Sequence, residues 1–419
     1  MNVINTFASL EPDKRRNLLL LLATGLLFWS SLTTLLPTLP IYIEDLGGTT
    51  AQVGLVMGSF ALGLIGSRTW LGYLADTHTR KLVVRIGALV AAIAPLGYLL
   101  IPSVLPLIAV RAFHGISLAA FTTGYSALVV DLSPIKQRGE LIGYMSLVAP
   151  IGMAIGPVLG AFLQETAGYQ LLFVASTILG IVAYFLAHPI QEQHRQQHKE
   201  SNLDVSETPV RTFRQLFMSP SLLLPGLILW LIGLVFGTLL AFLPLFLREV
   251  SLGFNAGQFY LAAAIASFAA RIFSGQASDR YGRGLFITGS LLCYVLSMAL
   301  LTQAKTSQEL LISAILEGAG SGMCIPMIIA LISDRSSMSE RGRVYAFCLG
   351  GFDLGMVIAG PILGALGEII DYRSMFLLAA GLAAIAMVLF LSHSNKSFKQ
   401  SLRFALGKGQ DLYALKYHL

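Results

Sequence analysis

The chain has 419 residues, of which 55% are hydrophobic and only 12% are charged, and its mean hydropathy is +0.73. Such a composition excludes a soluble domain of the ordinary kind and indicates a protein of the lipid bilayer. A net charge of +6 would suggest a nucleic-acid partner for a soluble protein, but the placement of Lys and Arg, described below, excludes that reading.

A helix needs about twenty apolar residues to cross a membrane, and runs of that length recur along the whole chain. They predict an all-α polytopic fold with twelve transmembrane helices. Their approximate ranges are 17–43, 51–75, 82–103, 105–130, 141–164, 168–188, 222–247, 256–277, 284–303, 308–332, 344–367 and 374–393.

Five parts follow from these runs. We expect a cytoplasmic N-terminal segment (1–16), a six-helix bundle (17–188) and a cytoplasmic linker (189–220). A second six-helix bundle (221–393) and a basic cytoplasmic tail (394–419) follow. Residues 1–16 are polar and end in a basic cluster, so we expect no removable signal peptide.

Metal binding is weakly indicated. His194 and His198 in the linker could share a helix face, but with no obvious third ligand a solvated segment is the better reading. The three cysteines, Cys293, Cys324 and Cys348, have no metal-ligand spacing and read as packing residues.

The basic tail leaves two readings open. Its cations alternate with Phe404, Leu406, Leu412 and Leu415, a pattern that fits a segment lying on anionic lipid. A disordered basic tail fits equally well.

The Lys and Arg residues orient the chain. If the N-terminus is cytoplasmic, nearly all of them fall in inner segments, and the outer segments hold only Arg248, Lys305 and Arg373. The positive-inside rule then places both termini in the cytoplasm. We expect the protein in the cell membrane, with the bilayer and a small-molecule substrate as its partners, and as a monomer.

The segment Gly72–Lys81 recurs as Gly275–Arg283, each copy between two long apolar runs. The same spacing relates further pairs along the chain: Arg68 and Arg271, Gly115 and Gly318, and Asp131 and Asp334. The chain is therefore an internal duplication. Two equivalent membrane halves are the sequence signature of a secondary transporter.

The first copy resembles a loop of the major facilitator superfamily, with the pattern Gly-x-Leu-Ala-Asp-Arg-x-Gly-Arg-Lys. The matching residues are Gly72, Leu74, Ala75, Asp76, Arg80 and Lys81. Thr77 and Thr79 replace the family's Arg and second Gly, whereas Arg280 and Gly282 keep both in the second half. The resemblance covers residues 17–393 and implies two pseudo-symmetric six-helix bundles with a substrate site near the bilayer midplane.

In that family the loop acts as a conformational latch, with an Arg that meets an acid at the inner end of helix 4. The resemblance maps this latch onto Gly72, Asp76, Arg80 and Asp131 in the first half, and onto Gly275, Asp279, Arg283 and Asp334 in the second. We expect the latches to stabilise the outward-facing state and to differ in strength. The alternative is that these charges only enforce topology.

The segment Gly152–Gly160 resembles a helix 5 motif, Gly-x-x-x-Gly-Pro-x-x-Gly, that the family associates with exporters running as antiporters. Its residues are Gly152, Gly156, Pro157 and Gly160, and helix 11 repeats part of it as Gly360, Pro361 and Gly364. Small residues four apart also simply pack helices in membranes, so export is favoured by this motif without being shown.

Leu36–Pro40 resembles the Pro-x-x-Pro element of twelve-helix drug/proton antiporters. That group commonly carries an acid within helix 1, and this helix offers only Ser and Thr. Proton coupling through helix 1 is therefore unsupported.

Charges inside membrane helices usually mark a transport pathway. Arg111 and His114 resemble the family's Arg-x-x-Gln-Gly motif, with His in place of Gln, and they share one helix face. Glu317 stands at the position equivalent to His114, and Asp353 lies near the middle of helix 11. These carboxylates are the expected proton-coupling residues, with Arg111 as their partner or as a substrate anchor. The alternatives are a packing histidine and a static ion pair.

Trp29 and Trp230, on helices 1 and 7, are candidates for stacking on a flat or amphipathic substrate, although lipid-facing positions fit as well. The sequence thus predicts a non-enzymatic secondary transporter that exports a small organic solute in exchange for protons. It needs no cofactor beyond the proton gradient, and no phosphate-binding loop is present. A symporter or facilitator importing a sugar or organic acid, and a non-transporting receptor, are the rivals.

Overall fold

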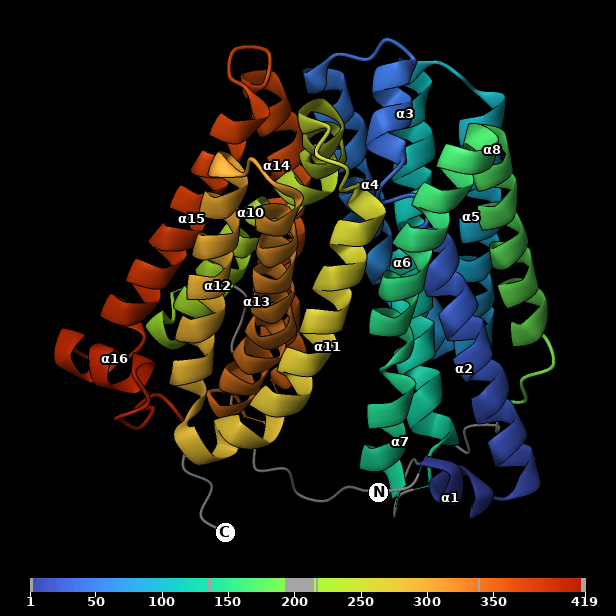
Figure 1. Cartoon of the computed structure of the whole chain (residues 1–419). Coiled ribbons are helices and arrows are strands. Elements are labelled where there is room, and N and C mark those ends of the chain that lie inside the picture. The colour runs from blue at the N-terminus through green and yellow to red at the C-terminus, as the bar shows by residue number, and fades with distance from the viewer. Residues whose placement is uncertain (1–2, 135–136, 193–214, 216–217, 338–339, 416–419) are drawn as a thin grey trace. The chain divides into compact units, whose positions relative to one another are not determined.

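The computed structural model describes residues 3–134, 137–192, 215, 218–337 and 340–415 (Figure 1). The chain divides into two compact units, residues 1–199 with 255–261, and residues 200–254 with 262–419. Residues 255–261, which the sequence places in the second bundle, group with the first unit. Most of the expected linker at 189–220, with His194 and His198, lies outside the described residues.

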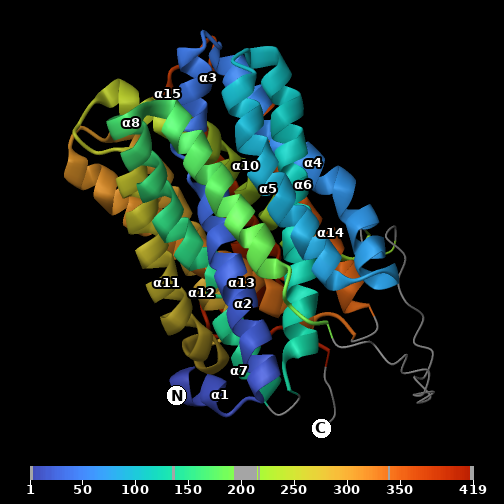
Figure 2. The ribbon, with the colours of Figure 1, turned by 90° about the vertical axis from the view of Figure 1, so that its right-hand side faces the viewer.

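The first unit is built from helices only, as far as it is described. They are α1 (Val3–Ala8), α2 (Pro12–Thr33), α3 (Leu39–Asp45), α4 (Thr50–Thr77), α5 (Arg80–Leu100), α6 (Val104–Leu132), α7 (Arg138–Met145) and α8 (Val148–Ala187). Figure 2 shows α2 running along α8, with α5 and α6 side by side.

The second unit continues with helices in its described part. They are α10 (Pro220–Val250), α11 (Ala256–Tyr281), α12 (Arg283–Gln303), α13 (Ser307–Asp334), α14 (Arg341–Leu366), α15 (Tyr372–His393) and α16 (Phe398–Ala405). The first residues of α11 belong to the first unit.

Eleven helices of the described chain are long and apolar enough to cross a membrane. One of them, α8, has 40 residues and contains Gly168 at φ 76°. A straight helix of that length would measure ~60 Å, about twice the hydrocarbon thickness. Gly168 adopts a backbone conformation that L side chains rarely tolerate and separates two arms, which correspond to the expected spans 141–164 and 168–188. The predicted all-α polytopic fold is confirmed.

The first expected span, 17–43, differs in detail because two helices occupy it. Residues 34–38 form turns between α2 and α3, and the Leu36 amide donates to the Thr33 carbonyl oxygen, three residues back, at 3.1 Å. Pro37 and Pro40 have no amide hydrogen, so the helical hydrogen-bond ladder cannot run on through them. The Pro-x-x-Pro element therefore ends the membrane helix.

Glycines allow the membrane helices to cross closely in both units. A Cβ atom on Gly115 of α6 would lie 1.8 Å from the carbonyl oxygen of Phe60 on α4, and one on Gly318 of α13 would lie 2.0 Å from that of Ala263 on α11. Phe60 and Ala263 are separated by the same spacing as Gly115 and Gly318. Each half of the duplicated sequence therefore forms the same helix crossing in its own unit.

The described part of the tail, residues 394–415, is folded onto the second unit, in place of the disordered tail that the sequence left open. Phe404 of α16 is buried and lies 6.1 Å, between ring centroids, from Phe390 of α15. Beyond α16 the chain returns to the end of α13, where the Leu415 amide donates to the Asp334 carbonyl oxygen at 2.8 Å.

Candidate functional site

A cluster of polar and aromatic side chains is buried inside the first unit. Arg111 and His114 of α6 are 3% and 0% exposed. The Tyr98 hydroxyl of α5 lies 3.1 Å from His114 Nδ1, and Arg111 Nη1 lies 3.5 Å from the same nitrogen. The Arg111 guanidinium stacks over the Phe60 ring at 4.5 Å. The structure thus brings together the two residues that the sequence placed on one face.

This cluster has unused hydrogen-bonding capacity. A guanidinium can only donate, so Nδ1 of His114 is the accepting nitrogen and a neutral ring carries its proton on Nε2. His114 Nε2 and Arg111 Nε are buried and have no hydrogen-bond partner among the described residues. Buried polar atoms of this kind are uncommon and are available to a solute or to water.

The second unit holds two buried carboxylates. Glu317 of α13 is 6% exposed and Asp353, halfway along α14, is 8% exposed. Glu317 makes no hydrogen bond or ion pair with any described residue. A charge in such a place is costly unless a proton or a counter-ion neutralises it.

The two candidate tryptophans both lie at helix crossings that involve a glycine. Trp29 of α2 and Trp230 of α10 are each half-buried, and each lies where its helix meets a glycine of a partner helix. A Cβ on Gly152 would lie 2.3 Å from Trp29 Cβ, and one on Gly355 would lie 2.3 Å from the Trp230 carbonyl oxygen.

Each unit contains the Arg–Asp pair of the expected latch. Arg80, at the start of α5, forms a salt bridge with Asp131 near the end of α6 and donates from Nη1 to the Ala127 carbonyl oxygen at 2.8 Å. Arg283, at the start of α12, pairs through Nε with Asp334 at 2.9 Å.

The remaining latch residues make fewer contacts than the Arg–Asp pairs. Asp76 is exposed at the end of α4 and makes no ion pair with a described residue. Within each unit, a Cβ on Gly72 or Gly275 would meet nothing within 4 Å, so no neighbouring helix packs closely on either glycine there. Asp279 lies in α11, and its side chain is outside the described part.

The helix 5 motif forms a seam between α8 and α2. A Cβ on Gly156 would lie 1.9 Å from Thr33 Oγ1, and one on Gly160 would lie 2.0 Å from the Thr34 carbonyl oxygen. Thr33 also donates to the Gly152 carbonyl oxygen at 2.9 Å. Pro157, inside α8, has no amide hydrogen to add to the helix.

In the second unit the equivalent seam joins α10 to α14, the helix that carries Gly360, Pro361 and Gly364. Close contacts there come from Gly233 and Gly355, whose added Cβ atoms would meet the carbonyl oxygens of Phe352 and Trp230 at 2.2 and 2.3 Å. Gly233 and Gly355 stand outside the Gly360-Pro361-x-x-Gly364 motif, so the motif gave no indication of their close contacts.

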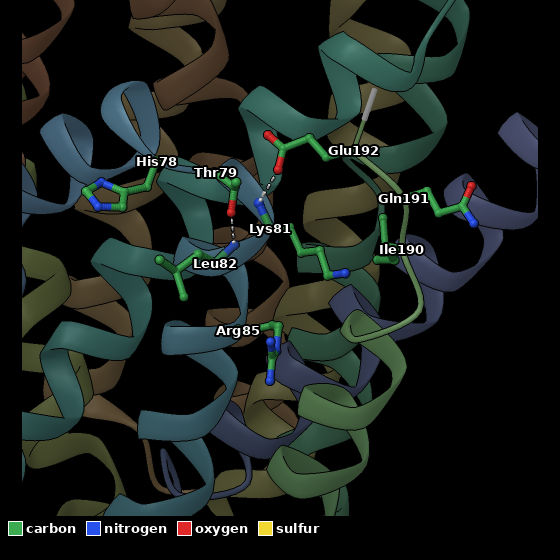
Figure 3. A pocket seen from close by; sticks show the side chains of 8 residues that line it. All are labelled: His78, Thr79, Lys81, Leu82, Arg85, Ile190, Gln191 and Glu192. Carbon is green, nitrogen blue, oxygen red and sulfur yellow. Dashed lines mark hydrogen bonds between the residues drawn. The ribbon is translucent and has the colours of Figure 1, made fainter. Parts of the chain in front are cut away.

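A pocket of about 740 Å³ lies beside the first latch (Figure 3). Its lining residues are His78, Thr79, Lys81, Leu82, Arg85, Ile190, Gln191 and Glu192. The Glu192 carboxylate accepts from the amides of Arg80 and Lys81 at 2.9 and 3.3 Å, and Thr79 Oγ1 accepts from Leu82 N at 3.1 Å. These two side chains satisfy the N-terminus of α5.

Sequence reasoning missed Glu192, Tyr98 and Phe60. Tyr98 and Phe60 lie on other helices than Arg111, and no spacing along the chain links them. Glu192 stands in a polar stretch that resembles any linker. Among the described residues, no group of three or more His, Cys, Asp or Glu side chains could hold a metal ion.

A duplicated set of membrane helices with buried charges and glycine-lined crossings defines a polytopic transporter. The sequence profile of the Major Facilitator Superfamily matches residues 21–307 and 261–406. The chain belongs to this superfamily of membrane transporters, as the loop motif indicated.

Characterised relatives cover nearly the whole chain. The staphylopine export protein of Staphylococcus aureus is 25% identical over 372 residues, which are 87% of this chain and 92% of that protein. The multidrug resistance protein MdtG of Escherichia coli is 26% identical over 380 residues, 88% of this chain and 91% of that protein.

Solved structures share the fold. A crystal structure of the nucleoside transporter NupG superposes with a TM-score of 0.76 at 17% identity, over 90% of this chain and 99% of that one. A bacterial homologue of the human lysosomal transporter Spinster, inward-facing and unoccupied, gives a TM-score of 0.70 at 17% identity, over 96% of this chain and 100% of that one.

Proposed function

We propose that the protein is a secondary active exporter that exchanges a small organic or amphipathic solute for protons by alternating access. The observation that carries the proton part is the burial of titratable side chains inside membrane helices, namely His114, Glu317 and Asp353. The export part rests on the two relatives, one named for staphylopine export and the other for multidrug resistance.

The proposed proton carriers are Glu317 and Asp353. An ionised carboxylate is poorly solvated in a membrane interior, and binding a proton removes that penalty. A carboxyl group that opens to water on alternate sides of the membrane then binds a proton from one compartment and releases it to the other. Glu317 suits this role because no described side chain neutralises it by an ion pair.

Arg111 is the proposed anchor for the solute. Its charge is fixed, its guanidinium is stacked on Phe60, and its Nε has no described acceptor. An acidic or strongly accepting group on the solute would satisfy that donor. His114, in contact with Arg111, is the adjacent group through which solute binding and protonation would be linked. Trp29 and Trp230 are proposed to stack on the solute's flat parts.

The α2–α8 seam supports the exporter reading. The glycines allow backbone contact between the two helices. Pro157 removes one helical hydrogen bond, so α8 can bend at this closely packed seam.

The two Arg–Asp pairs are the proposed latches of the outward-facing state. We further propose that both termini face the cytoplasm across the cell membrane, as the Lys and Arg distribution favours.

Import by symport or facilitated diffusion is the second candidate. The observation that favours it is the absence of an acidic residue in α2 beyond Asp13 in its first turn. A receptor on the same scaffold predicts ligand binding without flux.

Reconstituted vesicles test the proposal. A panel of organic acids, zwitterions and amphipathic cations is offered to vesicles with an imposed pH gradient of either sign. An exporter–antiporter accumulates the solute on the more acidic side of the membrane. Protons then move in the direction opposite to the solute. Co-directional movement supports the importer, and binding without flux supports the receptor.

A further inference from the structure

Helix α16, which follows the last membrane helix, has a face that is buried against the protein and a separate apolar stripe that is exposed. Ser401, Phe404 and Ala405 are buried against the second unit. Phe398, Leu402 and Leu406 are 66%, 37% and 45% exposed, and their spacing of four places them in one stripe along the helix and its C-cap. This exposed apolar stripe is separate from the face that packs on the protein.

The direction of this stripe is fixed by the contacts of the buried face. Thr288 Oγ1 of α12 donates to the Ala405 carbonyl oxygen at 2.9 Å. The Asn395 amide donates to Ser401 Oγ at 2.8 Å. A Cβ on Gly284 would lie 2.2 Å from the Phe404 carbonyl oxygen, so α16 lies directly on α12. The apolar stripe is therefore held outward and cannot turn inward without breaking these contacts.

A cationic stripe lies next to the apolar one. Lys399 and Arg403 are exposed, one position on from Phe398 and Leu402, and α16 contains no acidic residue. Going round the helix, the buried face is followed by the apolar stripe, then by the cations and then by exposed Gln400. This order places the apolar stripe between the protein and the charged side.

The apolar stripe also continues onto the membrane helices. Gly407, which ends α16 at φ 72°, lies against Leu285 of α12. Leu285, Leu292 and Leu296 are 40%, 43% and 46% exposed, and they follow one side of α12. In Figure 1, α16 lies crosswise to α15 at the end of the second unit.

We propose that α16 lies in the interface of the adjacent membrane leaflet, with Phe398, Leu402 and Leu406 in the acyl-headgroup boundary and Lys399 and Arg403 on the phosphates of anionic phospholipids. Only residues 394–397 separate α15 from α16, a length that spans at most ~14 Å. This short connection keeps α16 close to the end of α15, and a helix with apolar and basic stripes side by side is suited to the acyl-headgroup boundary.

The test uses the full-length protein in phosphatidylcholine vesicles, with and without phosphatidylglycerol. Cys293, which is half-buried, is replaced by Ala, while Cys324 and Cys348 are buried. Spin labels are placed singly through Leu402→Cys and, as the matched control on the same helix, Gln400→Cys. Collision rates with oxygen, which partitions into lipid, and with a water-soluble nickel complex are then compared.

We expect the label at position 402 to collide with oxygen and to be protected from nickel, and the label at 400 to show the reverse. Phosphatidylglycerol should increase the protection at 402, and Lys399→Gln with Arg403→Gln should abolish that increase, since each cation near an anionic surface contributes roughly fivefold to partitioning. Equal nickel access at 402 and 400 would overturn the proposal. So would protection of 402 from both reagents, which indicates a protein partner. This readout requires no transport.

Discussion

The guanidinium of Arg335 donates two hydrogen bonds to the carboxylate of Asp411, from Nε at 2.8 Å and from Nη2 at 3.1 Å. The Arg335 side chain is fully buried and that of Asp411 is 10% exposed. Arg335 also donates to the carbonyl oxygens of Ser221 and Ser394 at 2.9 and 2.7 Å. One buried cation therefore ties the tail to the ends of α10, α13 and α15.

Removing the acid from this pair should destabilise the second unit. Asp411→Ala leaves a buried arginine without its counter-charge, and breaking a buried pair in this way costs about 3–5 kcal/mol. The free energy of unfolding in mixed micelles measures the loss. Lys408→Gln, an exposed change in the same tail, is the control and should be neutral. Equal stability of Asp411→Ala and wild type would show that the tail carries no structural role.

The two latch pairs should respond unequally to loss of their acids. Asp334→Asn leaves Arg283 without its ion-pair partner, whereas Asp131→Asn leaves Arg80 still bonded to the Ala127 carbonyl. Both pairs are partly exposed, so each contributes only about 0.2–1 kcal/mol. We expect both variants to shift the population from outward-facing to inward-facing, Asp334→Asn by more, in label-to-label distance distributions.

Glu249→Gln, at an exposed site on α10, is the control for this measurement and should leave the distributions unchanged. If both latch variants also match wild type, these charges set topology alone.

The helix crossings predict position-specific effects of adding one methyl group. At Gly115 the new Cβ would lie 1.8 Å from a carbonyl oxygen, so α4 and α6 must separate, and overpacking of this kind costs about 1–3 kcal/mol. Gly318→Ala should behave alike in the second unit. Gly66→Ala, where nothing lies within 4 Å, is the matched control, and the yield of folded protein and its melting temperature are the readouts.

The start of α15 should show a pH dependence. Asp371 caps this helix by accepting from the Ser374 amide at 3.0 Å, and hydrogen bonding by Ser374 holds the pKa of the Asp371 carboxyl below its usual value. A depressed folded pKa gives stability that is present above the unfolded value of about 3.9 and is lost as pH falls through the folded pKa.

The protection of the first α15 amides, measured relative to the intrinsic exchange rate at each pH, should therefore fall at acid pH in wild type. Asp371→Asn should flatten that dependence, because an amide caps without titrating. An unchanged acid response in Asp371→Asn would assign it to another group.

Much of the fold could be predicted from the sequence because membrane helices are recognisable from the length and hydropathy of their apolar runs. The twelve runs and the duplicated register needed no tertiary information, and the Arg80–Asp131 pair followed from the family motif. The break after Thr33 was missed because hydropathy continues through Pro37 and Pro40. The two spans within α8 are separated by a single residue, Gly168, whose φ of 76° breaks the helix.

The surroundings of the candidate site were less predictable. His114 and Arg111 are three residues apart and share a helix face, but Tyr98 and Phe60 reach them from other helices, which only packing determines. Arg335 and Asp411 are far apart in the chain, and in the sequence each resembles an ordinary surface charge. One of the two readings of the tail set Phe404 beside lipid with the other apolar tail residues, yet it is buried, because the periodicity of a short helix does not say which of two apolar faces meets the protein.

Proton-coupled solute movement in reconstituted vesicles is the direct test of the proposed antiport. Wild type, Glu317→Gln, Asp353→Asn and the Glu249→Gln control are compared for solute-dependent proton flux and for solute exchange without a pH gradient. If Glu317 and Asp353 carry the protons, the two carboxylate variants lose proton flux and gradient-driven accumulation while retaining exchange, and the control retains all three. Normal pH-driven transport in both carboxylate variants would contradict that role.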